Sequence, residues 1–184
     1  MNPNSVPFTP TPPQALVAEL KVRARLGLKA LRSGDTRLLE RARLGGHRQN
    51  DPAEWRLGHC LTLVARSLGF TDWDQARRVL GGHAQPGDDL GAFWHAKACD
   101  RLLNHWFADL GRARELLRQA GPQRVLLPYR RQFVVVEEPY LRELGLSLQH
   151  LSSGVGPDLV QAYGSPAWRT LCWQRLQALP ECWG

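Results

Sequence analysis

The sequence predicts a mostly helical protein of the α+β class, with one small antiparallel β-hairpin. Apolar residues recur at helical spacing in most segments between the glycine and proline positions. A stretch of β-branched and apolar residues around position 130 is instead typical of strands. The 184 residues, of which 43% are hydrophobic and 22% charged, suit one ordinary domain or two small helical units and argue against global disorder.

The N-terminal half begins with a proline-rich segment and continues as a series of short helices. Residues 1–14 are rich in proline and small polar residues, which predicts a flexible or extended arm. Apolar residues then recur at helical spacing up to glycine stops, and Thr71 is placed to cap the last helix. We predict a helical module over residues 15–82, with helices at residues 15–32, 36–44, 56–68 and 72–80.

Residues 16–82 resemble a known small helical module. The resemblance lies in the runs LKVRARLGLKALRSGDTRLLERAR and LTLVARSLGFTDWDQARRVL, and the LGFTDW segment is its most specific part. The matching positions are Leu20, Lys21, Ala30, Arg32, Gly34, Asp35, Ala65, Gly69, Phe70 and Trp73. Such modules precede ankyrin repeats or enzymatic domains in many bacterial proteins. The resemblance implies a helical fold and no particular chemistry, and no ankyrin-type repeat of about 33 residues follows here.

We predict that residues 83–184 form a second domain of the α+β class, which is organised around a long central helix at residues 90–120. This stretch contains no proline and places His95, Cys99, Leu102 and Trp106 on one apolar stripe at helical spacing. A glycine-rich linker precedes it and marks the boundary between the two parts of the chain.

In the rest of this domain we predict one β-hairpin and two further helices. Residues 124–138 predict the hairpin, because two apolar runs flank the basic sequence PYRRQ. A short helix is expected from Pro139, irregular structure over residues 147–165, and a last helix over residues 166–179.

His95 and Cys99 are candidates for catalysis or metal binding, because they would lie one turn apart on the central helix. The pair could form half of a zinc site, or the imidazole could activate the thiol. The simpler alternative is a buried cysteine that acts as a small apolar side chain beside a hydrogen-bonded histidine. Since no CxxC or HxxxH motif supplies further ligands, we expect no metal and no cofactor.

Asn104, His105 and Asp109 form a second catalytic candidate on the same predicted helix. His105 and Asp109 would face each other across one turn, and a histidine–carboxylate pair can act as a general base. The alternative is an ordinary solvated contact worth roughly 0.2–0.5 kcal/mol.

Arg124, Tyr129, Arg130 and Arg131 form a candidate nucleic-acid site on the predicted hairpin. An aromatic ring beside guanidinium groups suits the binding of single-stranded nucleic acid. Glu137 and Glu138 follow closely, and the alternative is a solvated basic turn.

The charge of the chain leaves its partner open. The net charge is +7, and residues 1–82 hold thirteen basic residues against seven acidic ones. Most of the cations are arginine, which suits phosphate recognition or reflects a bias toward arginine codons.

The absence of motifs favours a binding protein over an enzyme. The sequence has no phosphate-binding glycine loop, GxSxG, HExxH or dinucleotide fingerprint. It also has no secretory signal, no membrane-spanning run and no close cysteine pair. We therefore expect a cytoplasmic bacterial module that binds a partner protein or nucleic acid and does not contact a membrane. The alternative is a small enzyme or metal-binding protein that uses His95, Cys99 and His105, and the oligomeric state stays open.

Overall fold

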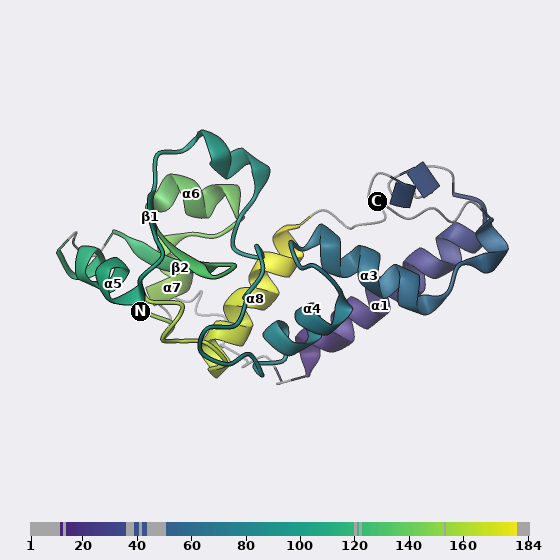
Figure 1. The fold of residues 1–184 in the computed structure, drawn as a ribbon, viewed down its shortest axis with the longest axis horizontal. Helices are drawn as coiled ribbons and strands as arrows, with labels where there is room; N and C mark the ends of the chain where they lie inside the picture. The colour runs from purple at the N-terminus through teal and green to yellow at the C-terminus, as the bar shows by residue number, and fades with distance from the viewer. Residues whose placement is uncertain are drawn as a thin grey trace, which may run out of the picture.

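The structure, a computed structural model, describes residues 12, 14–35, 39–40, 42–43, 51–119, 121, 123–152 and 154–179. Within these residues the protein is 54% helical, with seven helices and a three-stranded antiparallel sheet, which confirms the predicted α+β class. The N-terminal helices lie on one side of the molecule and the sheet lies on the other (Figure 1).

Three of the helices expected in the N-terminal half are present with nearly the predicted bounds. They are α1 (Ala15–Arg32), α3 (Leu57–Ser67) and α4 (Trp73–Leu80), and a short 3-10 helix, η1 (Pro52–Glu54), precedes α3. Helix α1 packs against α3 and α4 through a fully buried apolar stripe that includes Leu16 and Leu20.

Two other predictions for this half fall largely outside the described residues. Of the helix predicted at residues 36–44, the structure describes residues 39–40 and 42–43, and these are helical. Nearly all of the predicted arm at residues 1–14 lies outside the described part of the chain.

The cap of α4 is Asp72 and not Thr71. Oδ1 of Asp72 accepts a hydrogen bond of 2.8 Å from the backbone N–H of Gln75, because a short carboxylate at this position reaches the third N–H of the helix. The Gln75 side chain in turn accepts from the N–H of Thr71 at 2.7 Å. Its amide nitrogen donates to the carbonyl of Asp89 at 3.0 Å, which ties α4 to the segment that follows.

The prediction of one long helix at residues 90–120 is wrong for its first twenty residues. Before α5 (Leu110–Gln119) the chain forms a 3-10 helix, η2 (Lys97–Arg101), and a strand, β1 (His105–Phe107). Gly91 has a φ of +70°, in the left-handed region, and a Cβ built there would lie 2.5 Å from the Phe70 ring. A right-handed α-helix cannot include a residue with this φ, so the helix predicted from residue 90 cannot run through Gly91.

Contacts with distant parts of the chain determine the backbone of residues 90–109, where an apolar helix face was expected. Trp106 and Phe107 pair with Val134 and Phe133 of a neighbouring strand, and aromatic residues favour such strand positions. Cys99 is buried, but it belongs to the short 3-10 helix η2 and not to an α-helix. The helical spacing of apolar residues in this stretch therefore does not produce an α-helix.

The hairpin predicted at residues 124–138 is confirmed. It consists of β2 (Val125–Tyr129) and β3 (Gln132–Val136), joined by Arg130 and Arg131, and Arg130 has a φ of +53°. The strand order is β1-β3-β2, and all pairs are antiparallel.

The two faces of the sheet pack against different parts of the molecule. One face packs on α5 through Leu126, Val135 and Ala113, and the other face joins the main core. Successive strand residues point to opposite faces, so neighbouring side chains of the hairpin serve different surroundings.

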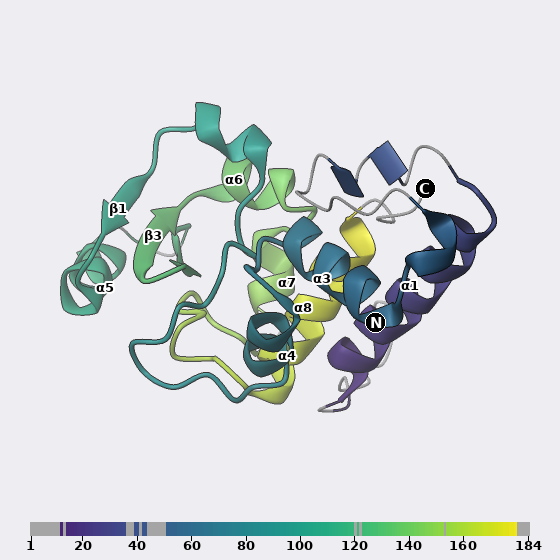
Figure 2. The ribbon, with the colours of Figure 1, turned by 45° about the vertical axis from the view of Figure 1, so that its right-hand side comes forward.

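The C-terminal part forms α6 (Glu138–Glu143), α7 (Leu148–Ser152) and α8 (Pro166–Ala178). Helices α6 and α8 confirm the predictions, whereas α7 lies in the segment expected to be irregular. Ser165 caps α8 by accepting from the N–H of Trp168 at 3.1 Å. Helix α8 lies between the N-terminal helices and the rest of the C-terminal half (Figure 2).

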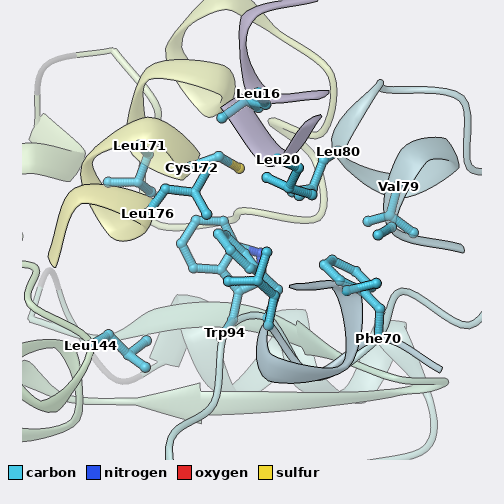
Figure 3. Packing of buried hydrophobic residues seen from close by; sticks show 14 of the residues in the cluster. Leu16, Leu20, Phe70, Val79, Leu80, Trp94, Leu144, Leu171, Cys172 and Leu176 are labelled. Atoms are coloured by element: carbon cyan, nitrogen blue, oxygen red, sulfur yellow. The ribbon is translucent and has the colours of Figure 1, made fainter. Parts of the chain in front are cut away.

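One hydrophobic cluster joins the N-terminal helices to the C-terminal half. Figure 3 shows Trp94 among side chains from several elements, with Phe70 beside it, Leu20 of α1 above it and Cys172 of α8 close by. The division into parts at residues 15–82 and 83–184 stays a prediction. Among the helices that the structure describes, none has the length and apolar character needed to span a bilayer.

Candidate functional site

Aromatic side chains gather where β1 and the hairpin tip meet the segment before η2. Trp106 and Tyr129 contact edge to face with their ring centroids 5.0 Å apart, and the His95 ring lies 5.2 Å from Tyr129. Strand register explains the meeting, since Trp106 pairs with Val134 and Tyr129 pairs with Gln132. Trp106 and Tyr129 therefore share one face of the sheet, because side chains alternate along each strand.

Part of this cluster is open to solvent. Trp106 is 42% exposed and Leu103, three residues earlier, is fully exposed. The guanidinium of Arg130 lies 5.6 Å from the centre of the Tyr129 ring, a cation–π contact. We refer to Leu103, Trp106, Tyr129 and Arg130 together as the Trp106 surface.

A chain of hydrogen bonds supports this surface from beneath. Nε2 of His95 is 2.9 Å from Oδ1 of Asp100, and Nδ1 is 2.8 Å from the hydroxyl oxygen of Tyr140. That hydroxyl also lies 3.1 Å from the carbonyl oxygen of Trp94. Tyr140 and Trp94 are buried, while the Asp100 side chain is largely exposed, so the chain runs from solvent into the core.

The single proton of the Tyr140 hydroxyl can be donated to only one of its two neighbours, Nδ1 of His95 or the carbonyl of Trp94. The Asp100 carboxylate only accepts, so Nε2 of His95 carries a proton in both cases. With a neutral ring, Nδ1 accepts from Tyr140; with a doubly protonated ring, Nδ1 donates to Tyr140, whose hydroxyl then donates to Trp94. Both ring nitrogens of His95 have a partner in either state, and the ring contacts Tyr129 edge to face.

Cys99 and His95 do not form the predicted pair one turn apart on a helix. His95 is engaged by Asp100 and Tyr140, and Cys99 is 1% exposed. Burial raises the pKa of the Cys99 thiol, although the nearby Arg175 works in the opposite direction. A buried neutral thiol of this kind is a poor nucleophile. No group of three or more His, Cys, Asp and Glu side chains suited to a metal ion occurs among the described residues.

Asn104, His105 and Asp109 are not brought together as a catalytic group. The Asn104 amide donates to the carbonyl of Leu102 at 2.8 Å, and Oδ1 of Asp109 accepts from the N–H of Arg112 at 2.8 Å at the start of α5. His105 belongs to β1 and is exposed. The predicted one-turn spacing of His105 and Asp109 is wrong because the strand ends between them.

The predicted basic site is divided by the hairpin. Tyr129, Arg130 and Arg131 lie together at its tip, but Arg124 lies at the opposite end of β2, where Nε is 3.0 Å from Oε1 of Glu137. A five-residue strand spans roughly 17 Å, so Arg124 does not share a site with the tip.

Sequence reasoning missed the roles of Leu103, Asp100 and Tyr140. Treating residues 90–120 as a helix placed Trp106 on a buried stripe, although the aromatic dipeptide Trp106-Phe107 is typical of a strand. No local signal links Tyr140 to His95, because 45 residues separate them.

Comparison with protein-family models, curated proteins and solved structures finds no match for this chain. The resemblance of residues 16–82 to a small helical module therefore stays a prediction.

Proposed function

We propose that the protein is a binding module that contacts a partner protein through the Trp106 surface. The observation that carries the proposal is the exposure of Trp106 and Leu103 within one short segment. Burying such apolar area in an interface is favourable, and tryptophan is enriched among the residues that dominate binding energy. Trp106 is also held in place, because Tyr129 and His95 contact its ring.

The position of β1 supports a protein as the partner. β1 is a terminal strand of the sheet, whereas the outer edge of β2 is bridged at Leu126 by Asp158. The backbone groups on the outer side of an edge strand can pair with an extended segment of another chain. A partner strand laid along β1 would lie directly beside Trp106 and Leu103.

The charges around the surface favour a protein over nucleic acid. Asp100 is largely exposed there, and the neighbouring Arg101 is paired with Glu143 at 2.5 Å. The guanidinium of Arg130 lies over the Tyr129 ring, where a base would otherwise stack. Single-stranded nucleic acid is usually bound by several stacking rings in a basic groove.

Site-specific photocrosslinking in cells tests the proposal. A photoreactive phenylalanine analogue at Leu103, which is fully exposed, should give one saturable protein adduct. The matched control is the same analogue at Leu26 of α1, which is 54% exposed and lies away from the sheet. This control position should not give that adduct.

A second substitution identifies the residue that binds. Trp106→Ala should weaken the captured complex by about 30-fold, the equivalent of about 2 kcal/mol for a central interface tryptophan. Circular dichroism should show an unchanged fold, since the ring is partly exposed. The proposal fails if both crosslinking positions give the same adducts, if Trp106→Ala has no effect, or if nuclease treatment destroys the adduct.

A further inference from the structure

A separate cavity lies on the other face of the hairpin tip. It has a volume of about 280 Å³ and lies between the loop at residues 84–90, the start of α5 and the segment before α8. Its apolar lining includes Leu90, Leu110, Phe133 and Val160, and two exposed arginines, Arg130 and Arg131, border it. Phe133 packs toward α5, on the sheet face opposite to Trp106.

Hydrogen bonds fix the walls of this cavity. The N–H of Arg130 donates to the carbonyl of Gly91 at 2.7 Å, and the N–H of Leu90 donates to the carbonyl of Arg130 at 3.0 Å. On the other side, the Tyr163 hydroxyl donates to the carbonyl of Val79 at 2.8 Å and accepts from the N–H of Ala84 at 3.0 Å. The cavity is therefore formed before any ligand enters, which lowers the entropic cost of binding.

The charge at the cavity is positive and unbalanced. Within the part of the chain that the structure describes, neither Arg130 nor Arg131 has an acidic side chain in ion-pair contact. Asp88 also lines the cavity, but its Oδ2 accepts from the N–H of Gln85 at 3.0 Å and lies 3.5 Å from Nε of Arg78. Its charge is thus largely compensated by groups of its own loop.

We propose that this cavity binds a small molecule that carries a carboxylate on an apolar body. The planar guanidinium group of Arg131 matches a carboxylate in geometry and charge, whereas that of Arg130 lies over the Tyr129 ring. The four apolar side chains would cover the body of the ligand. Ligand cavities usually measure roughly 300–1,000 Å³, so this one suits a single ring or a short aliphatic chain. The proposal goes beyond the proposed protein-binding function and uses the opposite face of the sheet.

Titration of the intact protein with octanoate tests this proposal, with octanol as the uncharged match and phenylacetate as the aromatic one. Calorimetry gives the affinity, and amide shifts in nuclear magnetic resonance spectra locate the site. Octanoate or phenylacetate should bind with a stoichiometry of one and shift Leu90, Leu110 and Phe133. Octanol, which lacks the carboxylate, should bind at least 10-fold more weakly than octanoate.

Matched variants separate the charged and apolar contributions. Arg131→Gln should weaken carboxylate binding at least 10-fold and leave octanol binding unchanged. Arg118→Gln, an exposed arginine of α5 outside this cavity, is the control and should have no effect. Val160→Phe should fill the cavity and weaken octanoate and octanol alike.

Three results would overturn the proposal. The first is no binding of either carboxylate at millimolar concentration, and the second is equal affinity for octanoate and octanol. The third is an equal loss of octanoate affinity in Arg131→Gln and Arg118→Gln. Trp106→Ala should not change the octanoate affinity, because the ring lies on the opposite face. Failure of the crosslinking experiment and failure of this titration can therefore be told apart.

Discussion

Replacement of Tyr140 by phenylalanine removes the hydroxyl at the centre of the buried hydrogen-bond chain. Tyr140 is 1% exposed, so no water replaces the lost group without a rearrangement of the core. The hydroxyl lies 2.8 Å from Nδ1 of His95 and 3.1 Å from the carbonyl oxygen of Trp94. The substitution therefore removes about one net hydrogen bond and leaves a buried polar atom unpaired, at a combined cost of about 2 kcal/mol.

Urea denaturation followed by far-ultraviolet circular dichroism measures this loss. With an m-value of about 2 kcal/mol/M, the midpoint should fall by about 1 M, and the melting temperature should fall by about 4–8 °C. The slope should stay the same, because the phenyl ring still fills the space of the tyrosine ring.

Tyr129→Phe is the matched control for this measurement. The Tyr129 hydroxyl has no hydrogen bond among the described residues, and the ring is only partly buried. Its removal should change the free energy of unfolding by less than about 0.5 kcal/mol. Equal losses in the two variants would refute the view that the Tyr140 hydroxyl anchors His95 and the loop.

Two further predictions concern the buried cysteines. Cys99→Ala should lower the free energy of unfolding by about 1 kcal/mol, and native Cys99 should react slowly with a thiol reagent; rapid stoichiometric labelling would contradict its burial. Burial raises the pKa of the Cys60 thiol from 9.0 to about 11. Since the unfolded chain loses this proton first, Cys60 should reduce stability by about 1.4 kcal/mol per pH unit between those values and not below them. Urea midpoints from pH 8 to 11 should fall less steeply in Cys60→Ala, and parallel curves would contradict this.

Helices with clear start or stop signals could be predicted from the sequence. α1, α3, α4 and α8 each combine an apolar stripe with a glycine stop or a cap, and these are local signals. Gly69, with a φ of +85°, ends the turn after α3 where the sequence placed a stop. The hairpin was equally accessible, because its two apolar runs flank a short polar turn.

The segment from Gly91 to Asp109 could not be predicted in this way. Its apolar spacing fits a helix, but its backbone is determined by contacts with residues distant in the sequence. Gly91 packs against the Phe70 ring, and Trp106 pairs with Val134. Tertiary packing here overrides local propensity, which is the usual limit of periodicity arguments.

The candidate sites depended on that segment and changed with it. His95 remains in the site, but its partners are Asp100 and Tyr140 in place of Cys99. Arg130 and Arg131 remain at the hairpin tip, where they border a cavity that involves residues from four separate parts of the chain. Such a cavity has no sequence signature, because its lining forms only when α5 and the sheet have packed together.

The contact between α1 and α8 has a consequence for synthesis of the chain. Nη2 of Arg23 donates to the carbonyl of Leu176 at 3.1 Å, across 153 residues of sequence. At roughly 5–20 residues per second, α1 would leave the ribosome roughly 8–30 s before its partner helix is made. During that interval the apolar stripe with Leu16 and Leu20 lacks one of its packing partners and is open to other nascent chains. We expect the yield of folded protein to fall as the rate of expression rises, because more chains then expose this stripe at the same time.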